Sequence, residues 1–333
     1  MYTITAFIRY GCLWSSLLLL LTSSLQGQDY PKQYPLPSLK DWFLSTGNWQ
    51  TSPQIYVREF GKGKDTILML HGGWGAEHTG MISAVKSLED EYKFIFYDQR
   101  GSLRSPFPDS LITFNSHIED IELLRKALPL NKLRIIGHSM GAVLASAYAA
   151  KYPDRVRQLI LLAPAQLKNP IPEEDSELQQ IAFQKFQEFM KRPEVALEKE
   201  KYGLSKAESN LSSKEQTALF RINFAQRMLY NVDRWVELMG GRALYKGHVF
   251  GLTANTYPQD GWDYINRFSK GNYPVSIIAG DHDFLDFDNL LVKKWIKEIP
   301  SIELSIINKA GHIIWVDQPD IFDQTLRRAL NRK

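Results

Sequence analysis

The amino-acid sequence predicts an α/β fold, with a mainly parallel central sheet, helices on both of its faces and an inserted helical cap. Short apolar runs typical of buried strands alternate with helical segments along most of the chain. The alternation stops after Pro164 and resumes with the apolar run at 275–279. Over roughly 165–268, apolar residues recur at helical spacing and no buried strand is predicted. A helical insertion between two consecutive strands is the simplest account of these three observations.

The N-terminal segment has the features of a secretory signal peptide. Arg9 precedes five consecutive leucines, and a small and polar stretch at 22–27 follows them. We therefore predict cleavage after Gly27, export to the periplasm or out of the cell, and no stable membrane span in the mature protein. A retained membrane anchor is the alternative, although this apolar core is shorter than the roughly 20 residues that a spanning helix needs. The only cysteine, Cys12, lies in the same segment, so no disulfide is expected.

The composition of the 333 residues is that of a folded protein without a strongly charged partner. Hydrophobic residues make up 44% of the chain, which is enough for a large core in one domain with an insertion or in two domains. The 40 basic and 37 acidic residues nearly cancel, and they form no like-charge block that would bind nucleic acid. We expect a signal peptide at 1–27, a core of residues 28–164 and 269–333, and a helical cap at 165–268.

Each element of the predicted core has a local reason. The apolar runs at 55–60 and 66–70 flank the turn-forming residues 61–65 and predict a hairpin. Ser116 and Glu119 form a capping-box signal at the start of a helix. The other elements expected from their apolar patterns are a helix near 78–89, strands at 94–97 and 133–137, a helix at 140–151, strands at 156–162 and 275–279, a helix near 288–298, a strand at 302–307 and a helix from about 319.

A serine stands between two glycines where the strand at 133–137 ends and a helix starts. A serine hydroxyl is a weak nucleophile unless a base removes its proton, and a substrate carbonyl must be able to reach it. A sharp turn from strand to helix exposes the hydroxyl, and Gly137 and Gly141 leave room for that turn. The pattern Gly-x-Ser-x-Gly in this context indicates that Ser139 is a catalytic nucleophile. A packed turn that matches the pattern by chance is the alternative.

Two further residues complete the order Ser, acid, His that enzymes with this elbow have along the chain. His312 follows the strand at 302–307 and is expected to accept the serine proton. Asp283 follows the strand at 275–279 and is expected to orient the imidazole. Because all three residues follow strand ends, we expect them at one edge of the sheet. The alternatives for the acid are Asp281, Asp286 and Asp288.

The loop after the strand at 66–70 reads His-Gly-Gly-Trp-Gly and is predicted to form part of an oxyanion hole. Glycines let the backbone approach a substrate oxygen, and the start of a helix presents free N–H groups. The amides of Gly73 and Met140 are therefore the expected donors. Trp74 is the alternative to Gly73, and it is also a candidate substrate-binding residue.

Several polar residues near the predicted site are expected to be structural. Asp98 and Arg100 should form an ion-paired turn. His71 and His138 adjoin predicted site residues, but adjacency along the chain is a poor guide to a triad. The histidines and nearby aspartates do not reach metal-ligand spacing, so no metal is expected, and the predicted chemistry needs no cofactor.

Together these motifs resemble the α/β-hydrolase superfamily, which implies an α/β-hydrolase fold over nearly all of the chain after the signal peptide. The segments HGGWG at 71–75 and DQRGSLRS at 98–105 are similar to the HGGPG-like loop and the DQRGxGxS motif of the proline iminopeptidase branch. Those enzymes remove an N-terminal proline from short peptides and carry a helical cap in the place of residues 165–268. A cap glutamate there holds the free amino group of the substrate. Glu173 and Glu174 are candidates for that contact, and a solvated acidic loop is the alternative.

The predicted function is hydrolysis of a small-molecule or short-peptide acyl substrate by an exported serine hydrolase, through an acyl-enzyme intermediate. The resemblance makes a proline iminopeptidase-like aminopeptidase the leading subclass, and a carboxylesterase or lactonase with the same triad is the alternative. A non-catalytic binding protein on the same scaffold is a third candidate, against which the intact order of Ser139, Asp283 and His312 speaks. The sequence leaves the oligomeric state open.

Overall fold

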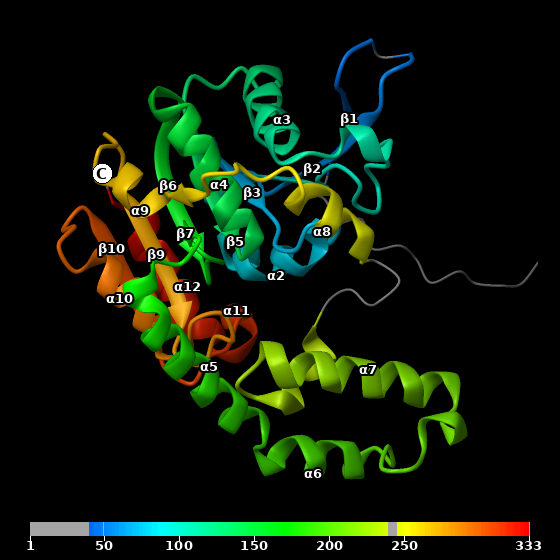
Figure 1. Ribbon diagram of the computed structural model, residues 1–333. Coiled ribbons are helices and arrows are strands. Elements are labelled where there is room, and N and C mark those ends of the chain that lie inside the picture. Colours follow the sequence, from blue (N-terminus) through cyan, green and yellow to red (C-terminus); the bar gives the residue numbers. More distant parts are fainter. Residues whose placement is uncertain (1–39, 49, 239–244, 333) are drawn as a thin grey trace, which may run out of the picture. The chain divides into compact units, whose positions relative to one another are not determined.

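The computed structural model describes residues 40–48, 50–238 and 245–332, which form an eight-stranded sheet with helices around it (Figure 1). The expected signal peptide, residues 1–27, lies outside the described residues. The strands of the sheet are β1 (Lys40–Ser45), β2 (Gln54–Phe60), β3 (Asp65–Leu70), β4 (Tyr92–Tyr97), β5 (Leu133–His138), β6 (Val156–Leu162), β9 (Val275–Gly280) and β10 (Ile302–Ile307). They lie in the order β1-β2-β4-β3-β5-β6-β9-β10. The first two pairs are antiparallel and the other five are parallel, which confirms the predicted mainly parallel sheet.

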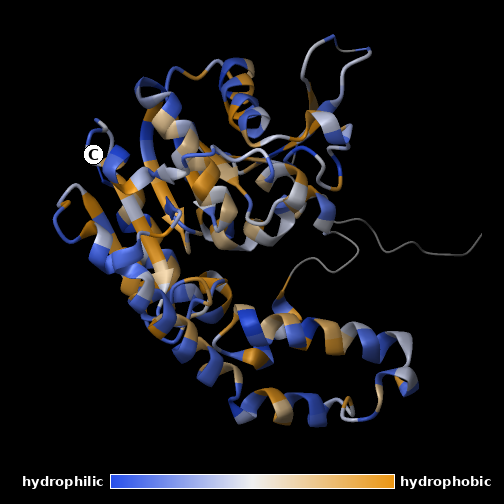
Figure 2. Ribbon diagram, viewed as in Figure 1, coloured by the Kyte–Doolittle hydropathy of each residue, from blue (hydrophilic) through white to orange (hydrophobic). Residues whose placement is uncertain are grey.

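Helices cover both faces of this sheet. The helices that connect or follow its strands are α2 (Ile82–Val85), α3 (Phe114–Ala127), α4 (Met140–Lys151), α10 (Leu290–Ile296), α11 (Ile314–Asp317) and α12 (Pro319–Leu330). Alternate side chains of β3 enter different cores: Leu68 and Leu70 cluster with α3 and α4, whereas Ile67 and Met69 cluster with α2 and α12. Because both faces are covered, the central strands are apolar along most of their length (Figure 2).

The hairpin expected from the first two apolar runs is wrong. β2 and β3 are each paired with β4, which lies between them. The turn that joins them crosses the start of β4 at close range, since a Cβ on Gly63 would lie 2.0 Å from the carbonyl oxygen of Glu91. The amide of Lys62 also donates to the carbonyl oxygen of Glu89 at 2.7 Å. The chain reverses direction where the turn residues predict it, but those residues carry no information about a third strand between the two.

The helices begin close to where their sequence signals predict. α4 and β6 have the predicted bounds. The N-cap of α3 is Thr113 rather than Ser116, because the Thr113 hydroxyl accepts the Ser116 amide at 3.0 Å. Ser116 therefore lies inside the first turn. Among the helices of the described ranges, none combines the length and the apolar character needed to cross a bilayer.

The chain leaves the sheet after β6 and returns at β9, and these two strands are hydrogen-bonded neighbours. Between them, residues 165–268 form the part that we call the helical insert. Its described elements are β7 (Lys168–Asn169), α5 (Ser176–Met190), α6 (Pro193–Lys201), α7 (Ser213–Met228), α8 (Gly247–Ala254), β8 (Trp262–Asp263) and α9 (Tyr264–Phe268). Ile222 of α7 shares an apolar cluster with Trp315 of α11, and Phe186 of α5 packs with Phe287. The helical insert thus packs against segments that follow β9 and β10.

Candidate active site

The carboxyl ends of four parallel strands meet at one edge of the sheet, and a predicted site segment follows each of them. These segments, after β3, β5, β9 and β10 respectively, are residues 71–75, Ser139, Asp283 and His312. The strand ends lie at the same level, because Gly137 of β5 pairs with Leu70 of β3 and Gly280 of β9 pairs with Ile307 of β10. The topology therefore brings the four segments to one side of the fold, as expected from the sequence.

Ser139 occupies a strained turn between β5 and α4. Its φ of 55° and ψ of −121° are rarely adopted by a residue with a side chain, and such a conformation costs about 1–3 kcal/mol. The turn needs glycine on both sides, since a Cβ on Gly137 would lie 2.4 Å from the Gly141 carbonyl oxygen. A Cβ on Gly141 would lie 2.2 Å from the carbonyl oxygen of Leu70. The amide of Ser139 donates to the Leu162 carbonyl at 3.0 Å, which fixes the turn against β6.

His312 and Asp283 form a buried pair. The two carboxylate oxygens lie 2.9 and 3.0 Å from Nδ1 of the imidazole. Nδ1 is therefore the nitrogen that carries the proton, and Nε2 is the one that can accept a proton. The amide of Leu285 donates to the same carboxylate at 2.9 Å and holds it in place. A carboxylate in this position orients the imidazole and stabilises its positive form.

The other three aspartates considered for this role are bonded elsewhere. Their partners are His282 for Asp281, the amides of Leu291 and Val292 for Asp286, and Lys185 for Asp288. Among these four candidates, all in the described part of the chain, Asp283 is the one that contacts His312. Asp286 serves instead to bind free amides at the start of α10.

The segments that carry Ser139 and His312 are joined through His138. Nε2 of His138 donates to the carbonyl oxygen of His312 at 3.1 Å, and the two rings are 4.6 Å apart. Burial lowers the pKa of His138 well below its usual value, so this ring is neutral and structural. Within the described ranges the imidazole of His312 is bonded to Asp283 and not to the hydroxyl of Ser139. Such bonds often tighten only with substrate, and the serine-to-histidine proton transfer stays a prediction.

The glycine loop after β3 passes directly beside Ser139. A Cβ on Gly72 would lie 2.7 Å from the Cβ of Ser139. Gly73 has a φ of 69°, a left-handed conformation that glycine adopts without strain. Among the described residues, the amides of Gly73 and Met140 donate no hydrogen bond to another group of the chain. Both amides are therefore available to a substrate oxygen.

Gln99 anchors this glycine loop, and sequence reasoning missed its role. Its side-chain amide donates to the His71 carbonyl at 2.9 Å, and its backbone amide donates to Nε2 of His71 at 3.1 Å. Burial lowers the pKa of His71, which is consistent with a neutral ring that accepts this bond. His71 is thus structural, as predicted. The motif at 98–105 was the signal that could have identified Gln99.

Trp74 is a core residue, so its candidate role in substrate binding is not supported. Its side chain is fully buried, and its indole N–H donates to the Tyr257 hydroxyl at 2.6 Å. The indole also stacks on His117 at a centroid distance of 5.0 Å. The aromatic character that suggested a substrate contact is used for packing between α3 and the helical insert.

Glu173 and Glu174, the candidates for binding a substrate amino group, lie on the surface of the protein. They are exposed in a short 3₁₀ helix, η5 (Glu173–Asp175), that precedes α5. Their carbonyl oxygens accept hydrogen bonds from Ser176 and Lys294 respectively. Among the described residues, neither glutamate side chain makes a hydrogen bond or ion pair with a triad candidate, so the structure favours the solvated loop over an amine-binding pair.

Asp98 and Arg100 do not pair with each other, which corrects the expected ion-paired turn. Arg100 makes two hydrogen bonds of 2.6 Å with Asp120 of α3. Asp98 is bonded to Nδ1 of His78 at 2.6 Å and to Nη1 of Arg104 at 3.1 Å. The turn after β4 is ion-paired, but its partners come from other segments of the chain.

Glu77, His78 and Asp98 bring three potential metal-ligand atoms within 4.8 Å of one another, a grouping that their sequence spacing did not reveal. Nη1 of Arg104 lies 3.0 Å from Glu77 and 3.1 Å from Asp98, so a guanidinium already balances the carboxylates. Burial alone would raise the pKa of Asp98, but the hydrogen bond and charge of His78 lower it to about 2. The group is an ion-pair network that fixes the loop after β4.

Asp317 is a second residue that sequence reasoning missed. Its buried carboxylate accepts the amides of Tyr230, Asn231 and Gly311, each at 2.8 Å. Tyr230 and Asn231 follow α7 of the helical insert, and Gly311 precedes His312. Asp317 therefore fastens the insert to the loop that carries the predicted base. No motif marks this residue, because its partners are backbone groups distant along the chain.

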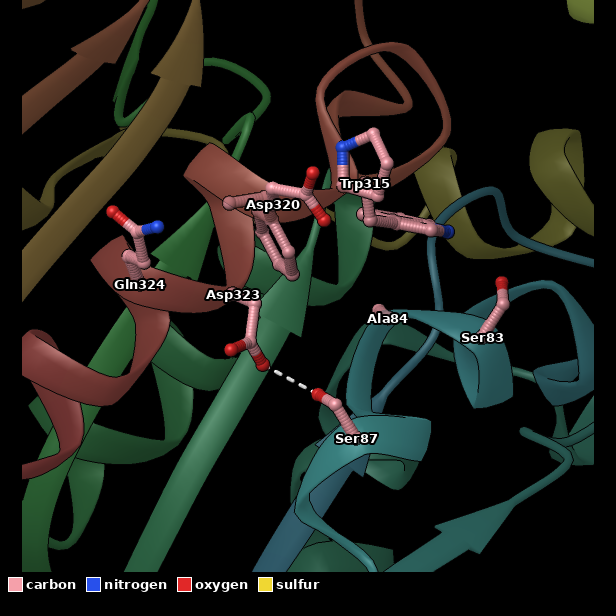
Figure 3. Close-up of a pocket in the computed structure, with 9 residues that line it drawn as sticks. Ser83, Ala84, Ser87, Trp315, Asp320, Asp323 and Gln324 are labelled. Carbon is pink, nitrogen blue, oxygen red and sulfur yellow. Dashed lines mark hydrogen bonds between the residues drawn. The ribbon is translucent and has the colours of Figure 1, made fainter.

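A pocket of about 410 Å³ lies between α12 and the 3₁₀ helix η2 (Lys86–Leu88) (Figure 3). Its lining includes Trp315 and Asp323, and the hydroxyl of Ser87 donates to Asp323. Trp315 also contacts His138 edge to face, with 4.9 Å between the ring centroids. None of the residues lining this pocket is a predicted site residue, so it is separate from the candidate active site.

Known proteins resemble this chain over most of its length. Residues 65–319 match the protein family described as alpha/beta hydrolase fold. A proline iminopeptidase from Lactobacillus delbrueckii subsp. bulgaricus is 26% identical over 301 residues, which cover 85% of this chain and 95% of that protein. This match extends from the sheet strands through the helical insert.

Solved structures share the architecture. A bromoperoxidase from Bacillus anthracis has a TM-score of 0.60 and 20% identity, and the match covers 88% of this chain and all of that one. A thermophilic esterase from Thermogutta terrifontis has a TM-score of 0.58 and 19% identity, with 87% and 98% of the two chains covered. At these identities the similarity concerns the fold alone.

Proposed function

This chain belongs to the α/β hydrolase fold family, and from that premise we propose that it is a serine hydrolase with Ser139, His312 and Asp283 as its catalytic triad. One observation carries the proposal: the sheet edge with the strained turn at Ser139 also bears a buried histidine–carboxylate pair. The residues next to this turn are glycines whose replacement would cause backbone clashes. A turn held at this conformational cost is typical of a functional site.

In the proposed reaction, His312 removes the hydroxyl proton of Ser139 as the serine oxygen attacks the substrate carbonyl carbon. The amides of Gly73 and Met140 bind the resulting oxyanion, and Asp283 stabilises the imidazolium. The imidazolium then gives its proton to the leaving group, and an acyl-enzyme forms. A water molecule, deprotonated by the same imidazole, releases the acid and restores the serine.

The leading subclass is a proline iminopeptidase-like aminopeptidase. Support comes from the iminopeptidase relative, which aligns with 85% of the chain, and from the motifs at 71–75 and 98–105. In this proposal the helical insert, residues 165–268, acts as a cap that excludes water and selects the substrate. We also propose that the protein is exported after cleavage at Gly27, which N-terminal sequencing of the mature protein tests.

A carboxylesterase or lactonase with the same triad is the second candidate. The exposure of Glu173 and Glu174 on η5 favours it, because a solvated carboxylate is a weak partner for the amino group of a peptide. An ester or lactone needs no such partner. The two candidates share the nucleophile, the base and the oxyanion donors.

Labelling and turnover together test the proposal. A fluorophosphonate should form an adduct on Ser139 in the folded protein, and Ser139→Ala should lower turnover by about four orders of magnitude. Prolyl and alanyl arylamides assayed beside short acyl esters separate the two subclasses. A mild effect of the alanine substitution, or an unlabelled serine, would remove this triad from consideration, and the protein would then be a binder or use another nucleophile.

A further inference from the structure

Arg227 lies at the end of α7, where the helical insert meets the loop of His312. The carbonyl oxygen of the next residue, Met228, accepts the amide of Ile313 at 3.2 Å. On the other side of His312, a Cβ on Gly311 would lie 2.6 Å from the same carbonyl oxygen. The end of α7 is therefore in contact with the backbone on both sides of the predicted base.

The side chain of Arg227 extends over Phe284, which adjoins the predicted acid in sequence. Its guanidinium carbon lies 5.1 Å from the ring centre of Phe284, and this ring meets the His312 imidazole edge to face at 4.8 Å. These two distances put the guanidinium no more than about 10 Å from the imidazole centre, roughly the span of three extended residues. The charge is therefore within reach of a small substrate whose reacting group is held beside His312.

The guanidinium of Arg227 has no acceptor within the described ranges, although the side chain is exposed beside a loop rich in aspartates. Those aspartates are engaged elsewhere, with His282, His312, the start of α10 and Lys185 as their partners. Other arginines in this region bind backbone carbonyls of the protein through their terminal nitrogens. Arg221 donates to the carbonyls of Val236 and Leu238, and Arg192 donates to those of Gln226 and Leu229.

We infer that Arg227 binds a carboxylate of the substrate, so that the preferred substrates are small acyl compounds with a carboxylate within about three residue lengths of the scissile bond. This inference rests on the proposed hydrolase site. A guanidinium forms two parallel hydrogen bonds with a carboxylate, and the ring of Phe284 offers an apolar surface for the chain between the two groups. A di- or tripeptide with a free C-terminus and an ester of a hydroxybenzoic acid both fit this description.

Matched substrates that differ only in the carboxylate test the inference. The pairs are prolylglycine with prolylglycinamide, and 4-acetoxybenzoate with phenyl acetate. The wild-type protein should prefer the carboxylate member of the pair that it hydrolyses by about tenfold in kcat/KM, and Arg227→Gln should reduce that ratio towards one. Lys214→Gln removes an exposed cation from the other end of α7 and should leave the ratio unchanged.

The outcomes separate this inference from the function on which it rests. Turnover of both members without a carboxylate preference, or a preference that survives Arg227→Gln, overturns the carboxylate site and leaves the hydrolase proposal standing. If the protein hydrolyses none of the esters and amides, the proposed function is wrong. In that case calorimetry tests the carboxylate site directly, by measuring the binding of benzoate and of benzamide to the wild type and to Arg227→Gln. Equal binding of the two compounds to the wild type overturns the inference.

Discussion

Replacing Asp317 by asparagine should weaken the attachment of the helical insert to the His312 loop. In the wild type, one carboxylate oxygen accepts the amides of Tyr230 and Gly311, and the other accepts the amide of Asn231. Asparagine keeps one acceptor oxygen, and its NH₂ group then faces an N–H donor. An unsatisfied buried donor costs about 1–3 kcal/mol, and the two remaining bonds lose their charge assistance.

Part of this cost is offset, because the wild-type carboxylate is itself penalised by burial. Burial raises the pKa of Asp317, which means that it disfavours the charged form. Backbone hydrogen bonds act in the opposite direction. A neutral asparagine avoids that penalty, so we expect a net loss of about 2 kcal/mol in the free energy of unfolding. Urea denaturation at neutral pH measures this loss, and hydrogen exchange should show faster exchange at the amides of Tyr230, Asn231 and Gly311.

Asp320→Asn is the matched control, because Asp320 is exposed, lies three residues further along the chain and makes no side-chain hydrogen bond or ion pair within the described ranges. Its effect should stay within about 0.5 kcal/mol. The reasoning is refuted if Asp317→Asn costs no more than this control, or if the three amides keep their wild-type protection. Either result would mean that other contacts hold the insert against the His312 loop.

Two further predictions concern the candidate site and the core. Asp283→Asn should lower kcat by about four orders of magnitude, because His312 would lose its orienting carboxylate. Circular dichroism should show an unchanged fold. A loss of less than tenfold in kcat would exclude Asp283 as the acid. Burial, followed by the charge of Arg100, lowers the pKa of His117 from 6.5 to about 3. Below pH 6.5 the imidazole is therefore protonated in the unfolded chain and still neutral in the folded chain. The stability advantage of the wild type over His117→Gln should therefore shrink by about 1.4 kcal/mol per pH unit from pH 6.5 towards 3, and a pH-independent difference in urea denaturation would contradict this.

The order of strands and helices was predictable because it depends on signals within single elements. Apolar runs predicted β6 and α4 at their observed bounds, and the glycines around Ser139 predicted the turn that the structure contains. The parallel character of the sheet followed from the alternation of these elements. The four segments were expected at one edge for the same reason.

Contacts between distant segments were not predictable in the same way. The expected hairpin was wrong because β4 enters between β2 and β3, and a turn signal contains no information about a third strand. Arg100 was paired with the wrong partner because Asp120 approaches it only after α3 packs. No sequence motif identifies Asp317, because its carboxylate accepts hydrogen bonds from backbone amides whose positions depend on the folded helical insert.

The pairing of β6 with β9 has a consequence for how this architecture can diverge. The residues on either side of the helical insert pair in neighbouring strands, as Leu159 does with Val275. The hydrogen bonds between β6 and β9 therefore do not depend on the sequence of the insert between them. A segment grafted from a related enzyme would need two junctions there and a way to satisfy the carboxylate of Asp317. If the insert selects the substrate as proposed, selectivity can change by exchange of this one module while the proposed catalytic groups at the sheet edge stay unchanged.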